Sequence, residues 1–157
     1  MATNQDLSQN DNTDLKSEIE SRFAQGMGAV KDLGIQIECT NGRLSHMHLP
    51  YRADLCVEDG QGLCPNLAST LLDTAFGLDV MLFANVKKYT ATIDYSTSLI
   101  AKPAHKVGLV ATTEVKGTNH NSVIMTGEVR ELETGSLVLT GQGNFLFNKP
   151  STSSVVS

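Results

Sequence analysis

Apolar and polar residues follow a helical period in the middle of the chain. Between residues 65 and 83, the apolar positions form two adjoining stripes on a helical wheel, which together cover more than half of its circumference. The stripes consist of Leu67, Leu71, Ala75, Leu78 and Leu82, and of Leu72, Phe76, Val80 and Phe83. A surface helix needs an apolar stripe only about 100° wide, so the pattern predicts a long central helix enclosed on most sides. Pro65 is a favoured residue for its first turn.

A second helix is predicted near the N-terminus. Leu15, Ile19, Phe23 and Met27 recur at every fourth position and give one apolar stripe, which Thr13 or Asp14 can cap. Glycines at positions 26, 28 and 34 loosen its end. Residues 1–12 are rich in Asn, Gln, Asp and Ser, and we expect them to be a disordered tail, like residues 149–157. A single domain is expected over residues 13–148.

Strict alternation of apolar and polar residues predicts strands on both sides of the central helix. Ile35 and Ile37 alternate with polar neighbours, and Asn41-Gly42 is a strong hairpin signal because both residues tolerate positive φ. The second strand continues through residues 44–49 and ends at Pro50. After the helix, four long strands are expected over residues 87–99, 105–117, 121–132 and 136–147. Turns at 117–119 and 133–135 make the last three an antiparallel meander.

These elements add up to an α+β domain. A long central helix is wrapped by one curved antiparallel sheet of about six strands, with an extra N-terminal helix. Such a domain has an exposed sheet edge and an unfinished helix face, and both features favour dimerisation.

Composition and charge narrow the class of protein. The 157 residues are 40% hydrophobic and 18% charged, as expected for one globular domain. A net charge of -5 argues against a general nucleic-acid binder, which needs a basic surface. The start of the chain has no apolar segment typical of a secretory signal, and the run from Leu67 to Phe83 contains two aspartates. We therefore expect a cytoplasmic protein with no membrane partner.

The cysteines and histidines do not form a metal-binding pattern. Cys39, Cys56 and Cys64 are odd in number and contain no CxxC pair, which favours a reduced intracellular protein. His46 and His48 share one face of a predicted strand, but a solvated strand face explains them as well as a metal does. No metal site is predicted.

Two aspartates interrupt the central helix. Asp73 lies at the margin of the apolar arc, beside Ser69, Thr70 and Gly77. Desolvation there would raise its pKa and make it a better base or nucleophile toward a carbonyl group. The alternative is an Asp that makes local hydrogen bonds on an exposed part of the helix. Asp79 falls inside the apolar arc, and we expect the helix end to protrude beyond the sheet so that this carboxylate is solvated.

Three sequence blocks resemble the phenylacetate-degradation-type hotdog thioesterases. The first is residues 62–77, in which Leu71-Leu72-Asp73-Thr74-Ala75-Phe76-Gly77 is similar to an LLDTA-x-G block in the helix of that family. The second is Thr92-Ile93-Asp94-Tyr95 and the third is Gly141-Gln142-Gly143-Asn144-Phe145. Their order and spacing agree over about residues 33–147. The resemblance implies a hotdog fold, acyl-CoA thioesterase activity, and a homodimer or a homotetramer built as a dimer of dimers.

The resemblance also implies roles for individual residues. Asp73 would be the nucleophile or general base. A His-Gly-Gly segment normally precedes the helix, where its backbone N–H groups polarise the thioester carbonyl. The corresponding residues here are Cys64-Pro65-Asn66, which depart from the family because proline has no N–H to donate. The N–H of Asn66 or Leu67, or the Asn66 side-chain amide, is expected to act as the oxyanion donor instead.

Further substrate contacts are expected around this turn and on the next strand. Cys64, Pro65, Ser69 and Thr70 surround the expected site on the helix. The resemblance implies that a strand facing the helix in a partner subunit supplies a hydroxyl or amide near the thioester. Thr90 and Thr92 are candidates on one strand face, which Asp94 shares, although hydroxyl residues are also ordinary strand formers. The phosphates of coenzyme A need cations, and the candidates are Lys102 together with Lys87, Lys88, Lys106 and His105. Coenzyme A enters as part of the substrate, and no separate cofactor is expected.

Three functions remain open from the sequence. The first is a thioester hydrolase whose sites are built by two subunits. The second is a hotdog protein that binds an acyl thioester or another apolar ligand without hydrolysing it well. The third is a structural or interaction role with an empty site. A hotdog dehydratase is less favoured, because it needs a catalytic histidine and none lies near the helix in sequence.

Overall fold

A computed structural model describes residues 17–40, 44–57, 60–86 and 90–147. Several predicted features lie outside these residues. They are the tails at 1–12 and 149–157, the helix cap at Thr13 or Asp14, the turn at Asn41-Gly42, and Lys87 and Lys88.

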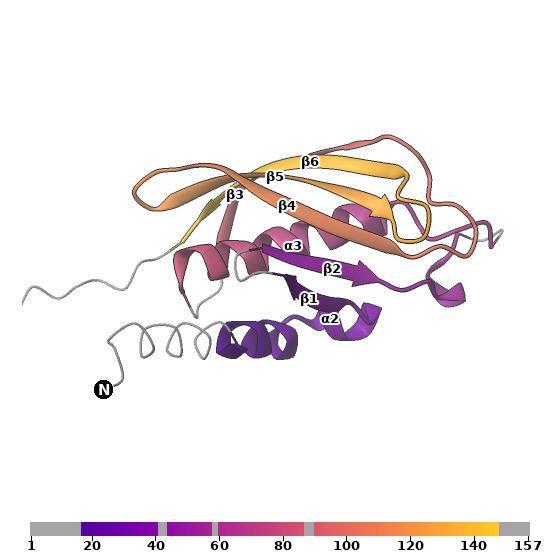
Figure 1. Ribbon diagram of the computed structural model, residues 1–157, viewed down its shortest axis with the longest axis horizontal. Helices are drawn as coiled ribbons and strands as arrows, with labels where there is room; N and C mark the ends of the chain where they lie inside the picture. Colours follow the sequence, from indigo (N-terminus) through magenta and orange to yellow (C-terminus); the bar gives the residue numbers. More distant parts are fainter. Residues whose placement is uncertain (1–16, 41–43, 58–59, 87–89, 148–157) are drawn as a thin grey trace, which may run out of the picture.

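A six-stranded antiparallel sheet curves over one long helix in the described part of the chain (Figure 1). The helix is α3 (Asn66–Ala84). The strands are β1 (Gln36–Thr40), β2 (Leu44–Leu49), β3 (Ala91–Leu99), β4 (Leu109–Thr118), β5 (Ser122–Glu131) and β6 (Leu137–Leu146). Their order across the sheet is β1-β2-β4-β5-β6-β3, so β4, β5 and β6 form the predicted meander and β3 is an edge strand. The predicted α+β class is confirmed.

Close approach of α3 to the sheet depends on two glycines in neighbouring strands. A Cβ atom added at Gly127 would lie 2.6 Å from one methyl group of Leu72, and one at Gly141 would lie 2.6 Å from the other. Leu72 and Phe76 therefore pack against bare backbone, and both are fully buried. The length and composition of α3 would also suit a membrane span, but the fold encloses most of it, so it is the core helix.

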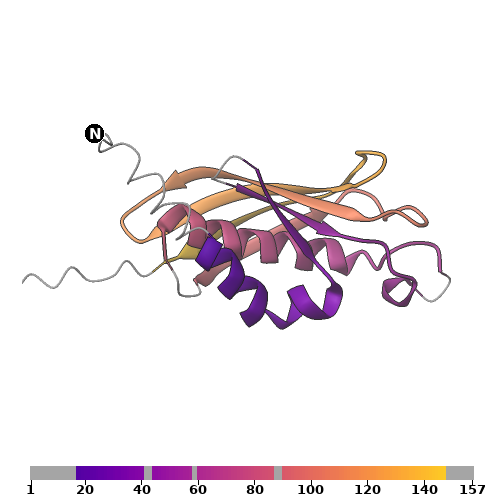
Figure 2. The same ribbon diagram turned by 60° about the horizontal axis from the view of Figure 1, so that its bottom comes forward.

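Two helical segments precede the sheet and lie on the side of α3 away from β4–β6 (Figures 1 and 2). Residues 17–26 are helical, and Ile19 and Phe23 of the predicted stripe are buried. The Phe23 ring would lie 3.5 Å from a Cβ at Gly77, so the small residue in α3 makes room for it.

The predicted loosening of this helix end is instead a break followed by a second helix. The chain leaves the helical conformation at Met27 and re-enters it as α2 (Gly28–Leu33). Gly34 ends α2 in the left-handed conformation with φ 70°, which glycine adopts without steric cost. The glycines thus divide the segment into two helices.

The burial of Asp79 corrects the expectation that its end of the helix protrudes into solvent. Asp79 is completely buried, and it accepts a hydrogen bond of 2.5 Å from the Thr113 hydroxyl of β4. A buried carboxylate needs such partners to offset the loss of water. The helical wheel correctly placed Asp79 inside the apolar arc of α3. It could not show that β4 covers this position and supplies a polar partner for the carboxylate.

Thr92 and Asp94 were expected on the same face of their strand, but an irregularity in β3 places them on opposite faces. Thr92 pairs with Phe145 but Asp94 pairs with Asn144, so Ile93 is an extra residue in this ladder. Phe145 packs against Phe76 of α3, and directly opposed residues of a ladder project to the same face. Thr92 therefore faces the helix, whereas Asp94 faces the outer side of the sheet.

Candidate functional site

The turn that leads into α3 is held by backbone contacts. Leu63 forms a bridge to Cys56, just after a short 3-10 helix, η1 (Ala53–Leu55). Gly62 has φ 152°, and a Cβ there would lie only 2.4 Å from the carbonyl oxygen of Pro103. Only a glycine allows these two loops to touch, so the loop containing Lys102 is fixed beside the start of the helix.

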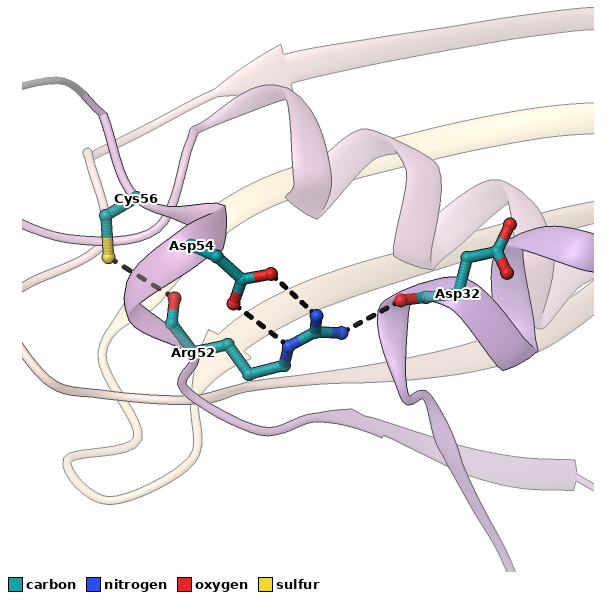
Figure 3. Close-up of polar contacts among 4 residues, drawn as sticks. All are labelled: Asp32, Arg52, Asp54 and Cys56. Carbon is teal, nitrogen blue, oxygen red and sulfur yellow. Dashed lines mark hydrogen bonds and ion pairs between the residues drawn. The ribbon is translucent and has the colours of Figure 1, made fainter.

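Arg52 holds η1 against the end of α2 (Figure 3). Its guanidinium donates two hydrogen bonds to the Asp54 carboxylate, at 3.1 and 2.6 Å, and one of 2.8 Å to the carbonyl of Asp32. The Cys56 thiol donates to the Arg52 carbonyl at 3.5 Å. A bidentate arginine pair has fixed geometry, so this cluster orients the loop that precedes the site.

At the N-terminus of α3, the backbone N–H of Asn66 has no hydrogen-bond partner among the described residues. The N–H of Leu67 donates to the Cys64 carbonyl at 2.9 Å, and that of Ala68 donates to Pro65 at 3.1 Å. Pro65 has no N–H, and the Cys64 N–H donates to Leu55 at 3.0 Å. Asn66 is exposed, and its N–H makes no hydrogen bond to a described residue. Of the two predicted backbone donors, Asn66 is therefore the available one.

Asp73 lies on the exposed side of α3, two turns after Asn66. Its carboxylate makes no hydrogen bond or ion pair with any residue in the described part of the chain, so the alternative of local hydrogen bonding finds no support there. The neighbouring hydroxyls are bonded to the helix backbone, Thr70 to the Asn66 carbonyl at 3.2 Å and Thr74 to the Thr70 carbonyl at 2.7 Å. Partial burial raises the pKa of Asp73 above its ordinary value of 3.8.

Tyr95 contacts the turn before Asp73 and was not among the predicted site residues. Its hydroxyl donates to the Ser69 carbonyl at 2.8 Å and lies 3.2 Å from the Ser69 hydroxyl. Its ring meets Phe76 edge to face, with the centroids 6.1 Å apart. Burial raises the pKa of Tyr95, and the charge of Asp73 raises it further, while the Ser69 hydrogen bond lowers it. The sequence held one signal, because Tyr95 is part of the Thr92-Ile93-Asp94-Tyr95 block.

The other predicted contacts fall into two groups. Cys64, Pro65, Asn66 and Leu67 form one turn, and Ser69 and Thr70 follow it toward Asp73. Across from the helix, Thr92 faces the same side of the sheet as Tyr95, and Thr90 lies just before β3. Lys102 is exposed in the loop that touches Gly62.

Solved structures with the same arrangement include several described as thioesterases. The PaaI protein of the phenylacetic acid degradation operon of E. coli matches with TM-score 0.72 and 14% identity, covering 86% of this chain and 96% of that one. A thioesterase family protein from Silicibacter pomeroyi gives TM-score 0.71 and 16% identity over 84% and 96% of the two chains. A thioesterase from Haemophilus influenzae gives TM-score 0.67 and 18% identity over 75% and 80%. The chain has the hotdog fold.

The structural likeness confirms the fold implied by the three sequence blocks. Comparison of the sequence with protein-family models and with curated proteins gives no match. The roles of Asp73 and of the other predicted site residues in this hotdog domain stay predictions.

A polar hollow of about 820 Å³ lies on the opposite face of the hotdog sheet. Its lining includes the side chains of Thr112, Glu114, Thr126, Glu128 and Gln142. Gly127 and Gly141 face Leu72 of the helix, so their neighbours along each strand face away from it. The sheet therefore separates this hollow from Asp73, and the hollow is not part of the candidate site.

No cluster of three or more metal-ligating side chains occurs among the residues that the structure describes. His48 Nε2 lies 3.1 Å from a carboxylate oxygen of Glu38 on the outer face of β1 and β2. This contact makes His48 part of a histidine–carboxylate pair on the outer sheet face.

Proposed function

We propose that the protein is a hydrolase of acyl-CoA or related thioesters, with Asp73 as general base or nucleophile. One observation carries this proposal. The Asp73 carboxylate lies on the core helix of a hotdog fold and has no hydrogen-bond or ion-pair partner among the described residues. Burial raises its pKa above 3.8, as expected for a carboxylate that accepts a proton during catalysis. The thioesterases among the structural neighbours support the reaction class.

The proposed reaction uses two groups of α3, the Asp73 carboxylate and the Asn66 N–H. Seven residues separate them by about 10 Å along one helix, so we propose that each site takes these two groups from two subunits. As general base, Asp73 takes a proton from water, and the hydroxide adds to the thioester carbonyl carbon. As nucleophile, its carboxylate adds directly and gives an anhydride that water then opens. In both routes the C–S bond breaks, and the thiolate leaves and takes up a proton. The N–H of Asn66 at the positive end of the helix dipole stabilises the oxyanion.

We further propose that a second copy of the chain completes the site. β3 is an edge strand, and every one of its residues except Tyr95 is exposed, including the apolar Ile93 and Leu99. An exposed edge of this kind is a template for pairing with another strand. A homodimer, or a dimer of dimers, formed along β3 would cover the acyl group between α3 and the partner sheet. Replacing both Ile93 and Leu99 by Lys should give monomers in light scattering, whereas Leu132→Lys should not.

Lys102 is the proposed contact for the coenzyme A phosphates. It is exposed in the loop that Gly62 holds against the start of α3, so its cation can reach a phosphate near the helix N-terminus. The cysteines Cys56 and Cys64 are free thiols, which suits a protein of the reducing cytoplasm.

The deciding experiment compares thioester hydrolysis by the wild type and by Asp73→Asn across acyl-CoA chain lengths. Loss of the base should lower kcat by about 10³-fold with an unchanged circular dichroism spectrum. Asp32→Asn, an equal change in α2, should leave kcat unchanged. Wild-type turnover that survives Asp73→Asn would contradict the proposed mechanism.

A second candidate function is binding of an acyl thioester without hydrolysis. It is favoured by the helix start, where proline removes one N–H and the Leu67 and Ala68 N–H groups are bonded within the turn. Saturable binding of a non-hydrolysable acyl-CoA analogue, with no turnover of any thioester in the panel, would select this function.

A further inference from the structure

Tyr95 is the one residue of β3 that is not exposed, and its side chain crosses from the edge strand to the core helix. The ring packs edge to face on Phe76, and the hydroxyl reaches Ser69, one turn before Asp73. Because β3 is an edge strand, this side chain links the outermost part of the sheet to the site.

The atom that Tyr95 contacts is directly connected to Asp73. In an α-helix the carbonyl of residue 69 accepts the N–H of residue 73. The Tyr95 hydroxyl donates to this same Ser69 carbonyl at 2.8 Å, so one oxygen accepts from both residues. A shift of the Tyr95 hydroxyl therefore acts on the helix turn from which the Asp73 carboxylate projects.

We propose that Tyr95 is a positioning residue that sets the placement and hydration of the Asp73 carboxylate through the Ser69 carbonyl. This role rests on the proposed function of Asp73 as base or nucleophile. Tyr95 itself touches no reacting atom in this scheme. It fixes β3 against α3, so the carboxylate projects from a turn that is held from two sides.

The electrostatics of the pair agree with this geometry. The negative charge of Asp73 contributes to raising the pKa of Tyr95, which places the phenol within the field of the carboxylate. Burial raises the pKa of Asp73. Removing the hydroxyl breaks the hydrogen bond between β3 and the helix, and we expect water to enter this turn. Desolvation of the Asp73 carboxylate then decreases, so its pKa should fall toward 3.8.

The test compares Tyr95→Phe with Ser96→Ala. Tyr95→Phe keeps the ring on Phe76 and removes only the hydroxyl, whereas Ser96→Ala removes a hydroxyl from the opposite face of the same strand. We expect Tyr95→Phe to lower kcat about ten- to a hundredfold with little change in KM. The acidic limb of its pH profile should move to lower pH, because a base with a lower pKa stays ionised in more acidic solution. Ser96→Ala should change neither quantity.

A second measurement separates failure of this inference from failure of the proposed function. The carboxyl ¹³C resonance of Asp73 reports its pKa whether or not the protein hydrolyses thioesters. A lower Asp73 pKa in Tyr95→Phe, but not in Ser96→Ala, supports the positioning role even if the wild type shows no turnover. An Asp73 pKa equal to that of the wild type would overturn it. So would a Tyr95→Phe protein that fails to fold, because the hydroxyl would then serve stability alone.

Discussion

Asp73 and Asp79 lie six positions apart on one helix and have opposite surroundings. Asp73 is exposed and has no hydrogen-bond or ion-pair partner among the described residues, whereas Asp79 is completely buried and bonded to Thr113. Because each residue of an α-helix rotates the direction of its side chain by about 100°, two side chains six positions apart point about 240° apart around the helix axis. One carboxylate therefore faces the open side of α3 and the other faces β4.

The difference shows what each carboxylate is able to do. A buried carboxylate that is already hydrogen-bonded contributes to the packing of the domain, and removing its partner leaves a costly group in the core. The Asp73 carboxylate, which has no partner among the described residues, is exposed, and partial burial still raises its pKa. Residue type is identical in the two cases, and burial with the hydrogen bond from β4 distinguishes Asp79 from Asp73.

The largest expected contrast is in catalysis. Asp79→Asn should retain kcat near that of the wild type, because Asp79 cannot reach substrate, while Asp73→Asn loses about 10³-fold. By contrast, Asp79→Asn should unfold at a lower urea concentration than the wild type, and Asp73→Asn should not. Steady-state kinetics and urea titration on both variants measure these opposite effects on kcat and on stability. Equal loss of kcat in the two variants would remove the functional distinction between the two carboxylates.

The next expected effect is at the start of the helix. Asn66→Asp places a carboxylate where the oxyanion is proposed to develop, so repulsion should lower kcat by about 10²-fold. The fold should tolerate it, since acidic residues favour a helix N-terminus. Asn66→Ala keeps the backbone N–H and isolates the contribution of the side-chain amide. If Asn66→Asp hydrolyses thioesters as fast as the wild type, the oxyanion does not form at this turn.

A smaller effect is expected on the stability of the core around the buried Asp79. Thr113→Val removes the hydroxyl that donates to Asp79 and should lower the free energy of unfolding by about 2 kcal/mol. Thr70→Val, at an exposed position near Asp73, should change it by less than about 0.5 kcal/mol. Equilibrium urea denaturation gives both values. Equal values for the two threonines would show that the Thr113 hydroxyl adds little to the stability of the core.

Much of the fold was predictable because its signals are local. The two apolar stripes of α3 predicted an enclosed helix over residues 65–83, and the structure has Asn66–Ala84. The hairpin of β1 and β2 and the meander of β4, β5 and β6 were also predicted from alternation and turn residues. In each case the period of the pattern is set by the element itself, so no knowledge of distant contacts was needed.

Three of the missed features depend on contacts between distant residues. Asp79 was expected in solvent because the partner on β4 lies 34 positions away in the chain. The extra residue at Ile93 changes which side chains of β3 face the helix, and only the pairing with β6 reveals it. Tyr95 belongs to the Thr92-Ile93-Asp94-Tyr95 block, but its hydrogen bond to Ser69 spans 26 positions in the chain and was not predicted.

The smallest expected effect is the dependence of stability on pH at Asp73. Its pKa in the folded protein is raised above 3.8, so folding favours the protonated acid. The stability contributed by this group is fully present below 3.8 and is lost as the pH rises through the folded pKa. Asp73→Asn cannot ionise, so its melting temperature at neutral pH should equal or slightly exceed that of the wild type. The two proteins should converge in acid when scanned by calorimetry. A variant that melts clearly below the wild type at neutral pH would show that the ionised carboxylate stabilises the fold, and Asp73 would then resemble Asp79 as a structural residue.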